Sequence, residues 1–437
     1  MNNSTEAPVR LRRPDRSQVT MRIACDDDLI AQGHPARVIW SVVKELDLSK
    51  FAEPIKAREG VSGRDATDPA LLVALWLYAA TRGVGSAREL ARLCAESNPY
   101  RWLCGGVTIN HHTLSDFRVN HAMALDELFT QVLGLLVSKG LVKVSRISQD
   151  GTRVRACAGA SSFRRGERLQ KLLDECRAHV SELRSLLDDP EKSAGLSAKK
   201  KAARTRAARD RQARIEAALK ALPELQAKQQ AAAKQAGNGK YGQKLKKNQP
   251  RVSTTDAEAR VMKMPDGGFA PAVNVQLAVD TESRAIVGVD VTSAGSDKGE
   301  AQPMRKQVED RSGSKVQEHL MDGGFLVLEE IDRAEEAGVT TFAPPPVPRD
   351  PSKAGTQYQP KASDSPAQAK WRERMGTEQA RTIYKERAAS SETVNADLKQ
   401  HRGLVQLTVR GLAKARCVAL WSALSYNLMH FGSALLG

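Results

Sequence analysis

Cysteine is scarce in this chain and is not arranged in metal-binding or disulfide patterns. The 437 residues include six cysteines, and no two of them are spaced as Cys-x-x-Cys. This argues against a zinc ribbon and against a disulfide framework, and it is typical of free thiols in a reducing cytosol. Cys94, Cys104, His111 and His112 are metal-binding residue types, but their spacing matches no common zinc finger.

Long apolar runs are also missing. The longest apolar stretch, residues 417–437, is interrupted by Ser422, Ser425, Asn427 and His430. A membrane-spanning helix needs about 20 consecutive, mostly apolar residues, so this stretch predicts a buried C-terminal helix. The first residues show no secretory signal pattern. We therefore expect a cytoplasmic protein without a membrane partner.

Positive charge is abundant and unevenly distributed. The formal net charge is +16 and the sequence pI is about 9.6. Residues 164–251 alone hold 23 Lys and Arg against 10 Asp and Glu. A strongly basic chain favours a polyanionic partner, and nucleic acid is the usual one. A solvated helix face is the alternative explanation for such a charged segment.

The first third of the chain has a helical pattern. We expect residues 1–34 to be a basic, disordered tail and residues 35–140 to be a helical domain for DNA binding or dimerisation. Asp68 followed by Pro69 predicts a helix start, and Gly83 predicts its end. Helices predicted over 86–96 and 113–121 are compatible with a helix-turn-helix variant presenting Ser115, Arg118 and Asn120, or with an ordinary helical bundle.

From residue 141 onward, strand and helix patterns alternate. Residues 142–156 predict a strand or a hairpin, with a turn signal at Asp150-Gly151. Residues 165–235 predict an antiparallel helical hairpin, and residues 236–251 a flexible basic linker. Two strands over 268–294 are joined by a turn at 280–283. A helix over 300–313, a strand ending near 322, a helix over 327–338, a strand over 340–343, a loop over 344–370 and terminal helices follow.

Three carboxylates occupy notable places in this pattern. Asp150 and Asp322 each close a short apolar run of strand type, and Glu392 lies in a helical stretch among basic and aromatic residues. Carboxylate oxygens are the ligands that Mg²⁺ prefers, and two such ions about 4 Å apart form a standard site for cutting and joining phosphodiesters.

The order of the elements is that of a ribonuclease H-like α/β fold. Such a fold has a mixed sheet with helices on both faces, here interrupted by the helical hairpin at 165–250 and preceded by the all-α N-terminal domain. In this arrangement Asp150 ends the first strand and Asp322 ends the fourth. These strands would be central neighbours, so both carboxylates would emerge at one edge, within reach of Glu392.

At this point the chain resembles bacterial insertion-sequence transposases of the DDE class. The resemblance covers most of residues 35–435. It is carried by "ISQDGTRVRA" with Asp150, by "MDGGF" with Asp322 and by "YKERAASSETVNADLKQHRG". The last segment is similar to the family's Tyr-Arg-Glu-Lys signature, represented here by Tyr384, Arg387, Glu392 and Lys399. Residues 68–106 resemble the family's helical N-terminal domain.

The resemblance implies a function. The protein would bind the terminal inverted repeats of its own element, cut DNA strands by hydrolysis and join the 3′-OH ends to target DNA. Asp150, Asp322 and Glu392 would be both the catalytic residues and the ligands of two Mg²⁺ ions, with Mn²⁺ as a substitute. Two ends must meet, so a homodimer is expected in the synaptic complex. The expected DNA-contacting residues are Tyr384, Arg387, Lys399, Arg118, Arg153 and Lys263.

Two departures from the family pattern stand out. The signature usually has three residues between Arg and Glu, and here there are four. On a continuous α-helix one extra residue rotates Arg387 by about 100° away from Glu392, and a helix start near residues 390–391 would relieve this. In addition, Phe325 stands where the family more often has Tyr.

Other acids and other functions compete with this interpretation. Asp280 is expected in a turn, Glu386 lacks the offset to Lys399, and Asp256 is most simply a cap. Asp290 and Asp297 lie in or after the third strand. The functional alternatives are a catalytically decayed transposase acting as a DNA-binding repressor, and a metal-dependent nuclease of the same fold.

Overall fold

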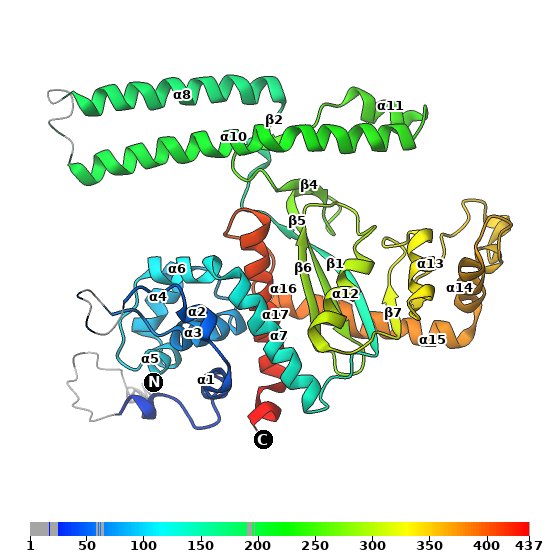
Figure 1. Ribbon diagram of the computed structural model, residues 1–437, viewed down its shortest axis with the longest axis horizontal. Coiled ribbons are helices and arrows are strands. Elements are labelled where there is room, and N and C mark those ends of the chain that lie inside the picture. The colour runs from blue at the N-terminus through cyan, green and yellow to red at the C-terminus, as the bar shows by residue number, and fades with distance from the viewer. Residues whose placement is uncertain are drawn as a thin grey trace, which may run out of the picture.

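The computed structural model describes residues 25–57, 65–189 and 197–436, together with residues 17, 60, 62 and 195. It shows a mixed α/β protein with a helical N-terminal region and one main mixed sheet (Figure 1). A long helical hairpin lies across the top of this view. None of the helices in the described segments is long and apolar enough to span a membrane.

In the described residues, seven α-helices form the N-terminal region. Asp68 caps α3 by accepting a hydrogen bond from the Ala70 amide, and Pro69 occupies the first turn, as the sequence predicts. Ten consecutive side chains of α3 are buried, so this helix is the centre of the region. The helices are α1 (Pro35–Glu45), α2 (Ser49–Ala52), α3 (Pro69–Thr81), α4 (Ala87–Glu96), α5 (Asn98–Cys104), α6 (His111–Asn120) and α7 (Ala122–Ser138).

The main sheet has the strand order β4-β5-β1-β7-β8, and β6 also pairs with β5. β1 is antiparallel to β5 and parallel to β7, while β8 is parallel to β7. The prediction that the strands carrying Asp150 and preceding Asp322 are neighbours is therefore confirmed. The strands are β1 (Arg146–Arg155), β4 (Arg260–Lys263), β5 (Phe269–Asp280), β6 (Ile286–Thr292), β7 (Glu318–Met321) and β8 (Thr340–Phe342).

Helices cover both faces of this sheet. α12 packs against β5 and β6, and a π-helix, η5, packs against β1 and β5. Successive side chains of a strand point to opposite faces of its sheet. Ser148 contacts Ser391 in η5, and the next residue, Gln149, hydrogen-bonds to the Glu300 carbonyl before α12, so these two helices lie on opposite faces. The helices are α12 (Ala301–Ser312), α13 (Leu328–Glu336), α14 (Pro366–Gly376), α15 (Glu378–Arg387), η5 (Ala388–Glu392), α16 (Thr393–Gln400) and α17 (Leu412–Leu436).

The C-terminal helix α17 joins the helical region to the sheet. It packs against α1, α3, α6 and α7 as well as against β6. Fourteen of its residues are buried, including Asn427, whose side-chain amide pairs with both backbone groups of Ile286 in β6. The predicted buried C-terminal helix is thus confirmed, and one continuous hydrophobic core runs through both parts of the molecule.

The insertion is a helical hairpin, as predicted, with a small core of its own. α8 (Gly166–Asp188) packs along α10 (Ala198–Gln235) through Leu169, Leu173, Ile215 and Leu222. A two-stranded sheet of β2 (Phe163–Arg164) and β3 (Val252–Ser253) forms the base where the chain leaves and re-enters the main sheet.

Several local predictions were wrong. Asp150 does not end the first strand and is no hairpin corner either, because β1 continues through Gly151 to Arg155 and Asp150 lies mid-strand. The connection between the two candidate recognition helices contains α5, with Pro99 in its first turn and Gly105 as a left-handed cap. Residues 240–247 of the predicted flexible linker form α11 (Lys240–Lys247), and α14 starts within the predicted loop.

The predicted N-terminal tail is described only at its end. Residues 25–34 include a 3₁₀ turn, Asp26–Leu29, and Asp27 accepts hydrogen bonds from Arg37 and Trp102. Residues 25–34 therefore form defined contacts before the predicted boundary at residue 35. The rest of the predicted tail, apart from residue 17, lies outside the described residues.

Candidate active site

The two aspartates meet where β7 ends. Gln149 of β1 and Met321 of β7 form the last parallel pair between these strands. Asp150 and Asp322 are the next residues of each chain segment, so the pairing brings both to the point where β7 ends. Asp322 lies outside β7, and its carboxylate accepts a hydrogen bond from the Gly324 amide at 2.7 Å. The parallel register thus brings the two aspartates together as the sequence predicts, but only Asp322 follows the end of its strand, because β1 continues past Asp150 to Arg155.

The residues on both sides of Asp322 hold its loop in place. Met321 and Phe325 are buried in one cluster with Ala301 and Ala343. Phe325 is fully buried among apolar neighbours, so a phenyl ring in place of tyrosine satisfies this position. A side chain at position 324 would begin 2.8 Å from the Asp322 carboxylate oxygen, which explains the glycine there.

Glu392 approaches from the helical side through an uncommon turn. The chain from α15 into α16 passes through the π-helix η5 without a break. A π-helix bonds residue i to i+5 and therefore takes up one residue more than an α turn. The extra residue of the signature is accommodated in this way, and no new helix starts at residues 390–391. Arg387 consequently lies beside Glu392, with 3.5 Å between guanidinium nitrogen and carboxylate oxygen.

Arg387 also connects Glu392 with Asp150. Its other terminal nitrogen lies 3.7 Å from the Asp150 carboxylate, and its Nε donates to the Tyr384 hydroxyl at 3.3 Å. Three signature residues and the first aspartate therefore converge. Lys399 is half-buried nearby; burial lowers its pKa, while the negative charge of Asp150 acts in the opposite direction.

Asp150 is the most perturbed acid of the site. Burial raises its pKa to about 6, the Arg387 charge opposes this, and the neighbouring charge of Asp322 adds to it. Its side chain is 19% exposed, whereas that of Glu392 is 58% exposed. A buried carboxylate beside a second carboxylate is costly to ionise, so a bound cation would stabilise its ionised form strongly.

The sequence analysis missed one partner of Asp150. Asn395, in α16, donates a hydrogen bond to the Asp150 carboxylate at 2.7 Å, and its own side-chain oxygen is buried without a partner. The only signal in the sequence is the offset of three residues from Glu392, which places Asn395 near the same helix face.

The face of β1 opposite Asp150 carries a buried polar network. Asp297 accepts hydrogen bonds from Asn274 and Gln276, both at 2.6 Å, and from Arg153 at 3.3 Å. Arg153, one of the predicted DNA contacts, is thus held inside the protein. A Cβ at position 151 would lie only 2.0 Å from the Asp297 carboxylate oxygen, which explains the glycine beside Asp150.

We expect Gly151→Ala to be strongly destabilising. Overpacking against a hydrogen-bonded carboxylate should lower the free energy of unfolding by about 2–4 kcal/mol. Urea denaturation monitored by circular dichroism would measure this. Gly134→Ala is the matched control, because a Cβ there meets no atom within 4 Å; equal stability of both variants would contradict the packing argument.

The competing acids have structural partners. Asp280 accepts from Ser283 in the turn between β5 and β6, as predicted. Glu386 pairs with Arg146, and Asp290 pairs with Arg416. Asp256 is buried and accepts from the Gly411 amide. Together with Asp297, all five are committed to contacts within the chain.

The remaining predicted DNA contacts lie apart from the acids. Lys263 is exposed on the strand β4. Arg118 donates to the Gly85 carbonyl and, at 3.2 Å, to the Thr408 hydroxyl, and it stacks over Trp76. Arg118 therefore ties α6 to the loop before α17.

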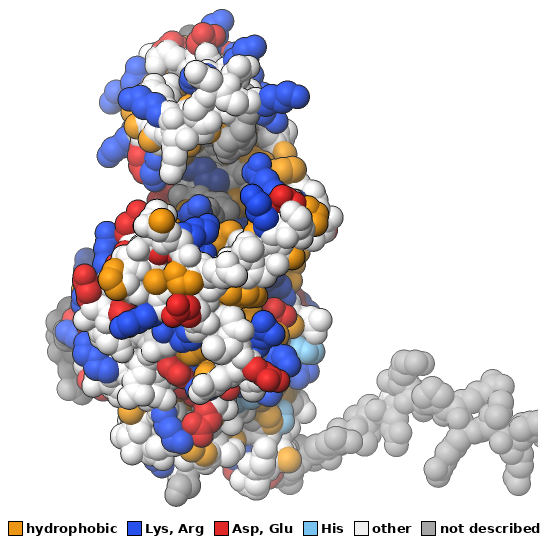
Figure 2. All heavy atoms as spheres, turned by 90° about the vertical axis from the view of Figure 1, so that its right-hand side faces the viewer, with side chains coloured by type: hydrophobic (Ala, Val, Ile, Leu, Met, Phe, Trp, Pro, Cys, Tyr) orange, Lys and Arg blue, Asp and Glu red, His pale blue; other side chains and the backbone are white. Residues whose placement is uncertain are grey.

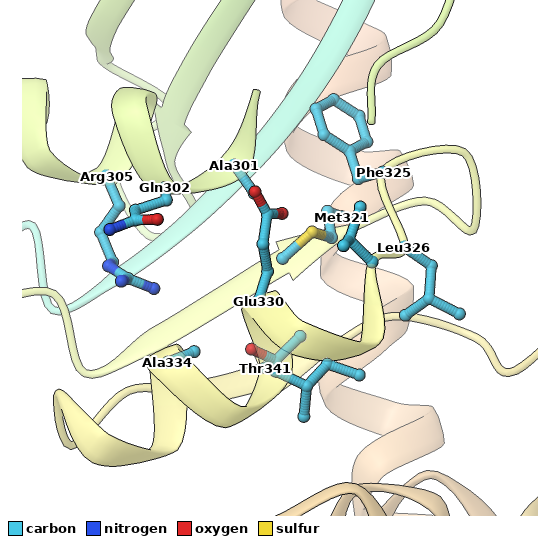
Figure 3. A pocket seen from close by; sticks show the side chains of 11 residues that line it. Ala301, Gln302, Arg305, Met321, Phe325, Leu326, Glu330, Ala334 and Thr341 are labelled. Atoms are coloured by element: carbon cyan, nitrogen blue, oxygen red, sulfur yellow. The ribbon is translucent and has the colours of Figure 1, made fainter. Parts of the chain in front are cut away.

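A small cavity lies behind the Asp322 loop but has no room for a ligand. Figure 3 shows the carboxyl group of Glu330 rising from α13 between Ala301 and Met321. Burial raises the pKa of Glu330. The volume is about 10 Å³, at most enough for a single water molecule. This cavity therefore offers no space for a large substrate.

The carboxylates of Asp150, Asp322 and Glu392 are suitable ligands for a divalent cation, but they are not arranged around a common metal position. Across the described segments, no group of three or more His, Cys, Asp or Glu is arranged to hold a metal ion. The guanidinium of Arg387 lies between Asp150 and Glu392 instead. Three oxygen donors with a raised pKa at Asp150 fit a hard cation, and its binding requires Arg387 to move.

Comparison with known families gives two matches. Residues 24–120 match the model of a transposase domain (DUF772), and residues 348–431 match that of a transposase DDE domain. The second match includes Tyr384, Arg387, Glu392 and Lys399, whereas Asp150 and Asp322 lie outside both matched segments. No curated protein and no solved structure matches the chain.

Proposed function

Because the chain belongs to the insertion-sequence transposases of the DDE class, we propose that it binds the inverted repeats at the ends of its element, cuts DNA there and joins the 3′ ends to target DNA. The observation that carries this proposal is the convergence of Asp150, Glu392, Arg387 and Tyr384, with Asp322 leaving the sheet beside Asp150.

The catalytic part is proposed to be ribonuclease H-like. Support comes from the mixed sheet, from the parallel pairing of the strands that precede the two aspartates, and from helices on both faces. In this proposal residues 35–140 form a DNA-binding or dimerisation domain and residues 141–437 the catalytic domain, with 165–250 as its insertion. A homodimer would hold two element ends together.

Asp150 and Asp322 would hold two Mg²⁺ ions, and Glu392 would complete one coordination shell. Bound there, such ions lower the pKa of a water and stabilise the leaving 3′ oxygen. Asn395 keeps the Asp150 carboxylate oriented. Arg387 would exchange its two carboxylate contacts for a DNA phosphate, and Lys399 would neutralise phosphate beside it.

The helical hairpin is proposed as an additional DNA contact. Residues 164–251 carry most of the excess positive charge of the chain. Figure 2 shows Lys and Arg side chains projecting from the hairpin at the top of the molecule. Charges spread along helices bind phosphates without reading sequence, so this contact would be sensitive to salt.

The test is cleavage of a labelled duplex that carries the element end. With Mg²⁺ or Mn²⁺ we expect the wild type to nick at the end and Asp322→Ala to show no detectable nicking, with end binding retained. Asp280→Ala is the control variant, because Asp280 lies in the turn between β5 and β6, and it should still nick the end. Binding without metal-dependent nicking by the wild type would favour the repressor alternative. Nicking without strand transfer would favour the nuclease.

A further inference from the structure

A second cationic surface lies away from the acids, between the helical region and the catalytic part. An open cleft of about 520 Å³ is formed by the starts of α4 and α6, by Cys157 after β1, and by residues 408–414. We name it the basic cleft. Its polar lining includes Arg88, Arg118, Arg410, Lys414, His111 and His112, and no Asp or Glu is among the described residues that line it.

Three of these cations are free to bind an external anion. Arg88, Arg410 and Lys414 are exposed. None of them forms an ion pair with a carboxylate in the described part of the chain, although many other Arg and Lys side chains do. Glu258, an acid that contacts the start of α17, accepts a hydrogen bond from the Leu412 amide.

The wall of the cleft is rigid. Arg118 bridges Gly85 on one side and Thr408 on the other, and stacks over the Trp76 ring at 4.8 Å. Its Nε is buried without a hydrogen-bond partner. The amino-terminal ends of α4 and α6, capped by Ser86 and Asn110, add partial positive charge. A pre-formed cationic surface loses little entropy when it binds a phosphate backbone.

The position of the cleft relative to the acids points to DNA. From Asp150, β1 continues to Arg155, and Cys157 lines the cleft two residues later. The segment that carries Arg410 and Lys414 is held beside this end of β1, because Arg155 is hydrogen-bonded to Val405 and Leu407 in the loop after α16. Seven residues at about 3.3 Å each span roughly 23 Å, which corresponds to about seven base-pair steps of 3.4 Å along a strand.

We propose that the basic cleft holds the DNA backbone about five to eight base pairs from the cleaved phosphate. This inference rests on the proposed function and adds the distance, in base pairs, between this contact and the cleaved phosphate. Arg410 and Lys414 from one wall and Arg88 from the other contact phosphates of the element end, while Arg118 keeps the two walls together. The hairpin would then contact a different stretch of DNA.

The test uses a double variant, Arg410→Gln with Lys414→Gln, and a charge-matched control, Lys139→Gln with Lys353→Gln. The control lysines are exposed and do not line the cleft. Affinity for a 40-base-pair duplex carrying the element end is measured by fluorescence anisotropy over a salt series without divalent metal. Phosphate-ethylation interference on the same duplex locates the contacts. Arg88→Gln serves as a second variant if the double variant does not fold.

Loss of two phosphate contacts should reduce the slope of log K against log salt by about 1.8. Interference five to eight base pairs from the cleaved phosphate should disappear in the cleft variant and persist in the control. An unchanged slope and interference pattern, in a wild type that binds and nicks the end, would overturn the cleft and leave the proposed function intact. A wild type that neither binds nor nicks the end would overturn both.

Discussion

Asp150→Asn is expected to abolish DNA cleavage and, at the same time, to stabilise the metal-free protein at neutral pH. Removal of a metal-binding carboxylate should lower the cleavage rate by a factor on the order of 10³ or more, equivalent to about 4 kcal/mol of transition-state stabilisation. The stability of the fold should change in the opposite direction, because keeping Asp150 ionised in its buried site costs free energy that asparagine avoids.

The pH dependence of this stabilisation follows from the direction of the pKa shift. Burial raises the pKa of Asp150 from 3.8 to about 6, so the carboxylate is easier to ionise in the unfolded chain than in the folded one. The wild type therefore loses stability as pH rises from about 4 to 6, while the variant does not. At one pKa unit per 1.36 kcal/mol, the advantage of Asp150→Asn should reach about 1–3 kcal/mol above pH 6 and vanish below about pH 4.

Urea denaturation with a chelator, at pH 4 and pH 7.5, measures this difference. Asp297→Asn is the control, and its effect on the free energy of unfolding should have the opposite sign. The buried Asp297 carboxylate accepts hydrogen bonds from Asn274, Gln276 and Arg153. Its loss should lower the free energy of unfolding at pH 7.5. A less stable Asp150→Asn protein at that pH would show that Arg387 and Asn395 compensate the burial of Asp150 fully.

Local signals predicted the regular elements well and misjudged those that depend on distant contacts. The cap at Asp68-Pro69 and the turn at Asp280 were predictable because the residues that make them are neighbours in sequence. Asp150-Gly151 carries a strong turn signal, yet the structure keeps it extended. Glycine is needed there because Asp297, far away in sequence, lies directly beneath the strand. No local pattern contains that information.

The candidate active site shows the same contrast between local and distant information. The sequence analysis proposed three acids, and the register of β1 and β7 supplies the reason why two of them meet. Asn395 was missed because its partner is 245 residues away. The bridging position of Arg387 was also hidden, since an α-helical count across five residues places Arg387 and Glu392 on different faces. Only the π turn at Ala388–Glu392 brings them together.

This π turn leads to the second large prediction: deleting Ala389 should preserve the site, whereas deleting Ala396 should destroy it. Ala389 is exposed in η5, where Ser390 donates to the Glu386 carbonyl within the widened turn. A π turn is an α turn with one residue added. Its removal should restore an α turn in which Arg387 and the glutamate are four residues apart and still adjacent.

Ala396 is also exposed, but it lies in the regular helix α16. Deleting it would rotate everything that follows by about 100°, turning Lys399 away from Asp150 and moving the fully buried Leu398 out of the core. We expect cleavage by the Ala389 deletion to remain within tenfold of wild type and cleavage by the Ala396 deletion to fall at least 10³-fold. The same end-cleavage assay measures both, with circular dichroism to check folding. Two folded deletion variants that were equally inactive would contradict this prediction. In that case the site would require the geometry of the π turn itself, and the adjacency of Arg387 and Glu392 alone would not be sufficient.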